Sequence, residues 1–464
     1  MLRVSAAAET AGIPSVSIIG SGFMKQSALV SKGIGLPLAI AEYPGAPMVD
    51  SDEAVTVKVE KDLMPAIIQG LTLAGRQESV PTPAEPSPGS IVFKGTLDQV
   101  QEHFHRQLWS DGLPVIPPTR RRVDTFLKFT NRNPEDVIRV LPQEGRAASI
   151  LSIAVNGVMA GCRPEYMPVL IAIAEAVSDP YFRIEGAGST AGWEPLVIVS
   201  GPIVKQLGLS FGAGVMKVGP QANTSIGRFA RLFFRNICGY RVAPGAGDKS
   251  SIGYTFNVAL AENEDWVSEI GWPTFAQDLG FNSGENVVTV QSVVCISPNT
   301  YSAGDAAISH VQQFVDVIGR AFGPGSQSGL KVGYWHPLIV VGPSIAQVIA
   351  RSWSKDEVRE YFWKNATVPA SLLMHQCLQI SGMELDFAQL VEQGVLPREY
   401  SASDDPDRAV RIVVKPEHIG LVVAGDPGRN QSRGYMGHHK HGARTSRRVE
   451  LPENWPRLLE EVRT

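Results

Sequence analysis

The sequence has few cysteines, no excess of charge of either sign and no long apolar run. Its 42 Lys and Arg residues against 46 Asp and Glu residues give a net charge of −4, which excludes a generally basic nucleic-acid-binding protein. The longest apolar stretch, residues 166–177, contains Pro168 and Glu175 and is shorter than the roughly 18 residues of a membrane span. We therefore expect neither a nucleic acid nor a membrane as partner.

The four cysteines form no Cys-x-x-Cys pair, and their spacing suits neither a zinc ribbon nor a disulfide framework. The N-terminal residues show no signal-peptide pattern, so we expect a cytoplasmic protein. Hydrophobic residues make up 44% of the 464 residues, enough for an extensive core. The 45 glycines and 33 prolines follow no Gly-X-Y period and indicate many tight turns.

The apolar pattern predicts an α/β protein with a small N-terminal unit and a larger body. Residues 1–75 alternate strand-like and helix-like segments, which implies a parallel sheet. Two strands make an incomplete sheet, so this unit either docks onto the rest of the chain or is completed by another chain. Residues 76–92 read as a Pro/Ser-rich linker, and residues 93–464 form a mixed α/β body.

A motif in the body occurs twice. Trp193-Glu-Pro and Trp335-His-Pro, 142 residues apart, each precede an apolar strand that ends in Gly-Pro. We expect an internal duplication with halves at about 145–285 and 286–425, followed by a basic loop at 426–450, and with residues 147–160 corresponding to residues 287–296. The alternative is two unrelated strands with similar turns.

Two segments are candidates for catalytic groups. Residues 109–119 hold Trp109, the acid Asp111 and several prolines, which would stiffen a loop that positions a catalytic acid or base; the alternative is a turn with Gly112. Cys162 ends an apolar segment next to Arg163, a position that could lower a thiol pKa; the alternative is a small buried residue.

Several polar residues suit the binding of an anionic substrate. Asn223 could cap a helix whose first turns hold Arg228, and free N–H groups at such an end bind anions. The chain has no Walker ending, and the alternative is an ordinary capped helix. The substrate-binding candidates are Trp109, Arg146, Asn156, Asn223, Arg228, Asp248, Arg429 and Arg433.

A metal site is a weaker hypothesis. Asp248 and Glu262 could bind a hard cation, and His438, His439 and His441 lie close together in the sequence. Arg and Lys neighbours would repel a cation from these histidines, so an anion-binding or subunit-contact loop is the favoured interpretation. The cofactor is unknown: we expect either none in this chain or, as the alternative, a divalent metal.

Most of the chain resembles the UGSC family of selenoproteins and their cysteine homologues. The segments that carry this resemblance are residues 9–18, Phe23, residues 33–37, the turn after Tyr43, residues 109–114, residues 161–168 and residues 223–228. The family's namesake (seleno)cysteine-Gly-Ser-Cys motif, which lies upstream of its Gly-Ile-Pro strand, occurs nowhere in this sequence. The resemblance implies either a split enzyme, in which a small subunit carries the motif and completes the sheet, or a member that lost thiol chemistry.

From this resemblance we expect the large subunit of an oligomeric, heteromeric enzyme, an oxidoreductase or a lyase. It would cleave a carbon–heteroatom bond in a small anionic organic molecule, with the reactive thiol or selenol on the partner. Asp111 would be the acid or base and Cys162 an auxiliary thiol. One alternative is a metal-assisted lyase or hydrolase, and a second is a non-catalytic scaffold or binding subunit.

Overall fold

The computed structural model describes residues 1–72, 87–188, 192–242, 247–248, 255–437 and 443–463. Helices and mixed sheets confirm the predicted α/β class. The chain forms two compact units, one made of Met1–Pro114, Glu135–Ser152 and Leu232–Lys249, the other of Val115–Pro134, Ile153–Arg231 and Ser250–Thr464. Of the predicted linker, residues 76–86 lie outside the described residues, and residues 87–92 are neither helix nor strand. No helix in the described part combines the length and apolar character needed to cross a bilayer.

The first unit contains a layered N-terminal part and a separate hairpin. Its elements are α1 (Leu2–Thr10), β1 (Val16–Gly20), the short helix η1 (Ser21–Phe23), α2 (Met24–Ile34), β2 (Ala39–Tyr43), α3 (Asp52–Lys58), η2 (Val59–Leu63), α4 (Met64–Thr72), α5 (Leu97–Arg106), β3 (Val137–Leu141) and β4 (Arg146–Ser149). Strands β3 and β4 pair antiparallel.

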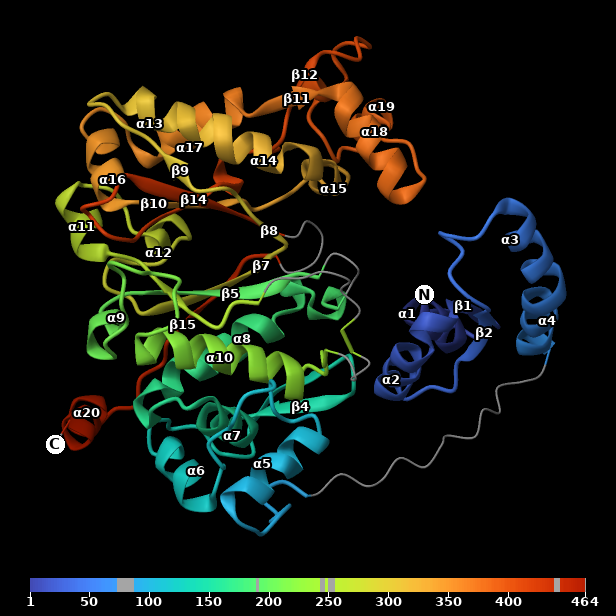
Figure 1. Cartoon of the computed structure of the whole chain (residues 1–464), viewed down its shortest axis with the longest axis horizontal. Coiled ribbons are helices and arrows are strands. Elements are labelled where there is room, and N and C mark those ends of the chain that lie inside the picture. Colours follow the sequence, from blue (N-terminus) through green and yellow to red (C-terminus); the bar gives the residue numbers. More distant parts are fainter. Residues whose placement is uncertain (73–86, 189–191, 243–246, 249–254, 438–442, 464) are drawn as a thin grey trace. The chain divides into compact units, whose positions relative to one another are not determined.

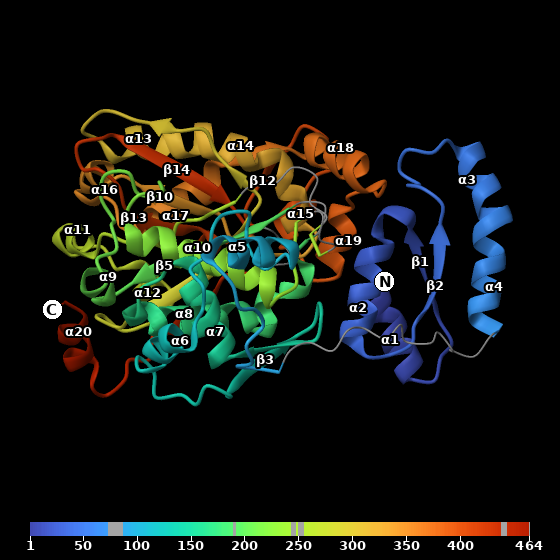
Figure 2. The same ribbon diagram turned by 60° about the horizontal axis from the view of Figure 1, so that its bottom comes forward.

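The N-terminal part is a two-stranded parallel sheet between two helix layers (Figure 2). Leu2 and Ala6 of α1 form one cluster with Leu38, while Tyr43 of β2 and Leu63 form another on the opposite face. Both faces of the sheet are therefore covered, as is usual for parallel strands. The sequence analysis predicted the strands and the helices after them but not α1.

The second unit holds the larger part of the chain (Figure 1). Its elements are α6 (Arg120–Leu127), α8 (Met167–Ser178), β5 (Glu194–Ser200), α9 (Ile203–Gln206), β6 (Leu260–Ala261), α11 (Glu264–Glu269), α12 (Phe275–Asp278), β7 (Val287–Val293), β8 (Cys295–Ile296), β9 (Thr300–Tyr301), α13 (Ala307–Gln313), η6 (Phe314–Gly319), α14 (Arg320–Phe322), α15 (Gln327–Leu330), β10 (Leu338–Val341), α16 (Pro343–Ala350), α17 (Lys355–Asn365), β11 (Thr367–Pro369), α18 (Ala370–Ser381), α19 (Phe387–Glu392), β12 (Ala409–Arg411), β13 (Gly420–Val423), β14 (Gln431–Met436), β15 (Thr445–Arg448) and α20 (Trp455–Arg463). Helices α7 (Ile150–Ala160) and α10 (Gln221–Asn236) run from one unit into the other along the chain.

Two sheets of the second unit repeat one topology. In the first, β5 pairs parallel with β6 and antiparallel with β7, and in the second β10 pairs parallel with β13 and antiparallel with β14. The registers also agree, because Ile198 of β5 faces Leu260 and Val340 of β10, 142 residues later, faces Val422. Apolar side chains of both sheets form one shared core cluster.

Each sheet is completed from the other half of the chain, by one strand in the four-stranded first sheet and by two strands, β8 and β9, in the five-stranded second sheet. Strand β8 follows β7 in sequence but pairs with β14, whereas β15 follows β14 and pairs with β7. The two halves thus exchange their last strands and form one folding unit. The strand pairings also place β7 with the first half, not at the start of the second half as the predicted boundary at residue 286 had it.

Other features obey the same repeat. Trp193 packs edge-on against Phe182, and Trp335 packs the same way against Phe322. The expected correspondence of residues 147–160 with residues 287–296 is wrong, because the first segment is mostly helix α7 and the second is mostly strand β7. A run of apolar residues did not distinguish a buried helix from a buried strand at these two places.

Candidate functional site

The predicted site residues divide between the two units. Trp109, Asp111, Arg146 and Asp248 belong to the first unit. The other predicted residues belong to the second unit: Asn156, Cys162, Asn223, Arg228, Arg429 and Arg433.

The segment around Asp111 forms a tight turn. Its Oδ1 accepts a hydrogen bond from the Leu113 amide at 3.4 Å, and Ser110 Oγ donates to the Leu113 carbonyl at 2.5 Å. Gly112 has a φ of +93°, a conformation that L residues rarely adopt. This arrangement is the turn that the sequence analysis held as the alternative. Trp109 packs edge-on against His103. Its ring therefore belongs to an aromatic cluster and not to an open site.

Arg146 is paired with a carboxylate of its own unit. Its Nε lies 2.7 Å from Glu144, whose other carboxylate oxygen binds Arg241. Glu144 is almost buried and pairs with both arginines, so Arg146 is held within the fold, although the two cations exceed the single carboxylate by one charge. The backbone amide of Asp248 donates to the Arg241 carbonyl, next to the same triad.

Cys162 has an environment that opposes a reactive thiol. It is buried, its Sγ donates to the Ser225 carbonyl, and burial raises its pKa to about 12, against which Arg228 has only a minor lowering effect. Arg163, expected to lower this pKa, instead pairs with Glu165 at 2.6 Å. The expected activation of Cys162 is therefore wrong, because desolvation disfavours the thiolate.

The predicted helix-end site is occupied by structural hydrogen bonds. Helix α10 begins before Asn223, whose side-chain amide accepts from the Ser210 amide and donates to the Ser210 and Ala259 carbonyls at 2.7–2.9 Å. The Asn223 side chain thus ties two loops together and has no group left for a substrate. Asn156 is buried within α7.

Neither the basic loop nor the candidate metal ligands form a binding site among the described residues. Arg429 is 78% exposed, and Arg433 on β14 donates to the Ser297 carbonyl. His438, His439 and His441 lie outside the described residues. Glu262 accepts hydrogen bonds from the Phe275 and Val423 amides, so its carboxylate is used within the fold. In the described ranges no three His, Cys, Asp or Glu side chains are grouped as metal ligands.

The structure instead brings together four residues where the exchanged strands pass between the sheets. We call this cluster the crossover site: Gln291 on β7, His336 just before β10, His418 just before β13 and Arg444 just before β15. Arg444 Nε donates to Gln291 Oε1 at 2.9 Å, and the rings of His336 and His418 lie 5.1 Å apart. Three of these residues lie just before a strand, and Gln291 lies within β7.

Much of the hydrogen-bonding capacity of the crossover site is unused. Within the described part of the chain, Gln291 Nε2, both ring nitrogens of His336 and Nδ1 of His418 are buried and make no hydrogen bond of good geometry, although the His418 backbone lies close enough to His336 to oppose the lowering of its pKa. Buried polar atoms are normally paired, so such a concentration needs an explanation. A ligand with several oxygen atoms would satisfy these groups.

Burial shifts the pKa values of the cluster towards neutral side chains. Burial lowers the pKa of His418 to about 4, assisted by Lys415, and holds the pKa of His336 well below its usual value, assisted by Arg444. Burial also lowers the pKa of Arg444 to about 10, which still leaves it charged at neutral pH. Two neutral imidazoles therefore lie beside one cation.

Behind the crossover site, buried cations outnumber buried carboxylates. Lys355 lies 2.9 Å from Asp278 and 3.9 Å from Glu262, and Arg359 lies 2.6 Å from Asp278. With Arg444, these residues make three cations against two carboxylates, and burial raises the pKa of Glu262 to about 7. Asp356, which also contacts Arg359, is 90% exposed and compensates little. The uncompensated positive charge favours an anion at the crossover site.

Comparison with known proteins gives this chain no relative. No protein family, curated protein or solved structure matches it.

Two of the four residues of the crossover site, His336 and Arg444, lie in segments that the sequence analysis singled out, but the site itself was not predicted. His336 stands in the Trp-His-Pro motif where the first copy has Glu194, and this difference within a repeat was the available signal. Arg444 was counted only as one of several basic residues of the C-terminal loop. His418 and Gln291 had no signal, since only strand pairing brings them to this place.

Proposed function

We propose that this chain is an enzyme subunit that binds a small anionic organic molecule at the crossover site and acts on it there. The observation that carries the proposal is the uncompensated cation Arg444 beside unpaired, buried groups of Gln291 and His336. Charge-assisted hydrogen bonds to a guanidinium are among the strongest that an organic anion can make.

The residues suggest a division of roles. Arg444 and the Gln291 amide would hold the oxygens of the anion, and a neutral imidazole of His336 or His418 would accept a proton. The low pKa values of both histidines leave them unprotonated at neutral pH, as a general base must be, although a pKa well below the working pH also weakens an imidazole as a proton acceptor. Among carbon–heteroatom cleavages, elimination fits best. The imidazole takes a proton from the carbon next to the one that bears the heteroatom, the C–H electrons form a carbon–carbon double bond, and the heteroatom leaves with its bonding electrons.

We also propose, following the family resemblance, that any reactive thiol or selenol comes from a separate chain. Its support is that burial raises the pKa of Cys162, Cys238 and Cys295 alike, so these thiols stay protonated at neutral pH. The metal-assisted alternative has less support, because Arg444 would repel a cation from the histidine pair.

The test is calorimetric titration of the full chain with a panel of short mono- and dicarboxylates, phosphate and sulfate. We expect at least one to bind, and Arg444→Gln to weaken that binding by 100-fold or more because it removes the cation of the crossover site. Arg429→Gln is the matched control, since Arg429 is 78% exposed and should leave the affinity unchanged. Equal binding by Arg444→Gln, or no binding by the wild-type chain, would overturn the proposal.

A further inference from the structure

The parallel register of β10 and β13 places the two histidines of the crossover site opposite each other. Leu338 pairs with Gly420, so the positions two residues earlier, His336 and His418, also correspond. The Gly420 amide donates to the Pro337 carbonyl at 2.8 Å, which continues the strand pairing towards the histidines, and the two rings lie 5.1 Å apart. The backbone of the sheet therefore holds this pair in place.

The guanidinium of Arg444 lies against the same two strand starts. Its Nη2 donates to the Pro337 carbonyl at 3.5 Å, and a Cβ on Gly420 would come within 2.7 Å of that nitrogen. Its Nε donates to Gln291, and the guanidinium lies 5.2 Å from the centre of the Phe275 ring. The cation is thus fixed beside the residues that follow the two histidines, where its charge adds to burial in lowering the pKa of both rings.

The ring of His336 needs a hydrogen-bond donor. A neutral imidazole has one N–H group and one bare nitrogen that accepts a hydrogen bond. Burial keeps the ring neutral by holding its pKa well below the usual value, and the His418 backbone opposes this lowering, as a carbonyl facing the N–H group would. No donor from the described part of the chain reaches the other nitrogen. A ligand that fits this ring must therefore bring a donor of its own.

The surrounding charge decides which donor is suitable. Burial lowers the pKa of His418, and Lys415 and Arg444 add to this lowering while Glu417 opposes it. A positively charged ammonium group would be repelled by Arg444, whereas a hydroxyl is neutral and can both donate and accept. Gln291 Nε2, buried without a hydrogen bond of good geometry, can donate to an oxygen of the same ligand. The cluster thus fits an anion that also carries a hydroxyl group.

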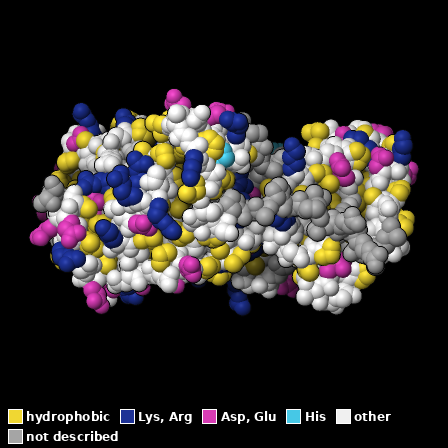
Figure 3. Space-filling view, turned by 90° about the horizontal axis from the view of Figure 1, so that it is seen from below, with side chains coloured by type: hydrophobic (Ala, Val, Ile, Leu, Met, Phe, Trp, Pro, Cys, Tyr) yellow, Lys and Arg dark blue, Asp and Glu magenta, His cyan; other side chains and the backbone are white. Residues whose placement is uncertain are grey.

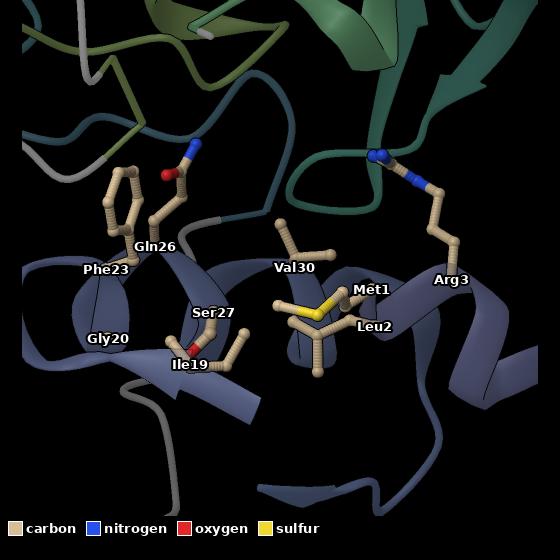
Figure 4. A pocket seen from close by; sticks show the side chains of 9 residues that line it. All are labelled: Met1, Leu2, Arg3, Ile19, Gly20, Phe23, Gln26, Ser27 and Val30. Carbon is tan, nitrogen blue, oxygen red and sulfur yellow. The ribbon is translucent and has the colours of Figure 1, made fainter. Parts of the chain in front are cut away.

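A hollow beside β1, in the N-terminal part of the first unit, makes no such demand. It has a volume of about 390 Å³ and a largely apolar lining, with Leu2 and Val30 pointing into it (Figure 4). Two polar side chains of its lining are bonded within the unit, because Gln26 Nε2 donates to the Gly247 carbonyl and Ser27 Oγ to the Met24 carbonyl. The unmet groups of the crossover site are therefore the more informative about a ligand.

We propose that the ligand of the crossover site is a hydroxycarboxylate, whose carboxylate binds Arg444 and whose hydroxyl donates to the bare nitrogen of His336. The inference rests on the proposed function and narrows its substrate class. A site that is built to bond a hydroxyl leaves a buried group unpaired when the hydroxyl is missing, so it discriminates strongly against the deoxy analogue.

Calorimetric titration of the full chain with matched acids tests this substrate class. The pairs are propionate with lactate, propionate with 3-hydroxypropionate, and succinate with malate. At least one hydroxylated acid should bind about ten-fold or more tightly than its deoxy partner. Alanine, β-alanine and aspartate carry an ammonium group in place of the hydroxyl, and they should bind more weakly than the corresponding hydroxy acids.

His336→Phe keeps a ring in place and removes both nitrogens. It should abolish the preference for the hydroxylated acid and leave the affinity for the deoxy acid unchanged. His310→Phe is the matched control for stability, because His310 is buried and both its nitrogens are bonded, to Ser302 Oγ at 2.7 Å and to the Gly304 carbonyl at 3.0 Å. Without ligand, His310→Phe should lower the midpoint of thermal unfolding, whereas His336→Phe should not, since it removes no hydrogen bond of good geometry.

The outcomes separate this inference from the proposed function. Equal affinities within every pair, a preference that persists in His336→Phe, or tighter binding of the amino acids would overturn the hydroxycarboxylate. An equal loss of thermal stability in unliganded His336→Phe and His310→Phe would also overturn it, because the ring nitrogens of His336 would then have structural partners. If Arg444→Gln still weakened binding of both members of a pair, the anion site itself would stand. Binding of no carboxylate would overturn the proposed function and this inference with it.

Discussion

The two halves of the second unit share a strand order but differ in how they treat polar groups at the same edge. In the first half, Glu194 is the first residue of β5 and pairs with Arg231 at 2.9 Å, with both side chains nearly buried. In the second half, His336 occupies the equivalent position and leaves both ring nitrogens unpaired within the described residues. One copy of the repeat thus has an internal ion pair where the other has the unused polar groups on which the proposed ligand site rests.

A second pair of equivalent positions shows how charge accumulates behind the crossover site. Asn223 of α10 donates to the carbonyl of Ala259, and Lys355 of α17 donates to the carbonyl of Leu421, its counterpart by strand register. A neutral amide in the first half therefore corresponds to a buried cation in the second. On the face shown in Figure 3, cationic and anionic side chains are interspersed.

The largest predicted effect tests this substitution of a cation for an amide. Lys355→Met should lower the free energy of unfolding by about 3–5 kcal/mol, because it leaves Asp278 and Glu262 with less compensation in the interior. Asn223→Leu should cost only about 1–3 kcal/mol, the usual range for unsatisfied neutral groups. Urea unfolding of both variants measures the difference, and equal losses would show that the charge of Lys355 does not matter.

A pH effect follows from Glu262, which has Ala424 as its counterpart in the second half. Burial raises the pKa of Glu262 from 4.5 to about 7, with Lys355 opposing and Glu264 adding to the shift. The folded state then binds this proton more tightly than the unfolded state, so the contribution to stability is full below about pH 4.5 and is lost as pH rises to about 7. Relative to Glu262→Gln, the wild type should lose on the order of 3 kcal/mol between pH 4.5 and 7.5. Other titrating groups cancel when the unfolding free energies of the wild type and Glu262→Gln are subtracted. A difference between the two that stays constant across these pH values would therefore contradict the raised pKa of Glu262.

The two halves also differ in how closely a helix packs against the sheet. Gly434 of β14 has Val290 of β7 as its counterpart, and a Cβ at Gly434 would come within 2.4 Å of Ile318. Gly434→Ala should therefore reduce stability by about 1–3 kcal/mol through overpacking. Gly212→Ala is the control, because nothing lies within 4 Å of its Cβ position, and it should be neutral. Thermal unfolding of the two variants provides the comparison.

These contrasts also show what the sequence could and could not predict. Hydrophobic periodicity and the Gly and Pro turn residues were sufficient to predict the α/β class and the strands after the repeated Trp-x-Pro motif, since both are local signals. The strand exchange and the crossover site were not accessible, because residues such as Gln291 and Arg444 meet only after β7 and β15 pair. Asp111, Cys162 and Asn223 were chosen for unusual local sequence, and the structure uses all three in turns, burial or structural hydrogen bonds.

The smallest predicted effect compares two arginines of the predicted basic segment at 426–450. Arg429 is 78% exposed and lies 3.9 Å from Asp426, an arrangement that contributes about 0.5 kcal/mol or less because water screens both charges. Arg429→Ala should thus leave the unfolding free energy unchanged within about that amount, whereas Arg444 contacts Gln291 and the carbonyl of Pro337. Guanidinium chloride unfolding in low salt, where surface charges act most strongly, measures the effect. If Arg429→Ala lowered the free energy of unfolding by more than 1 kcal/mol, exposure would not explain the difference between these two arginines. The charges of the basic segment would then contribute to stability together.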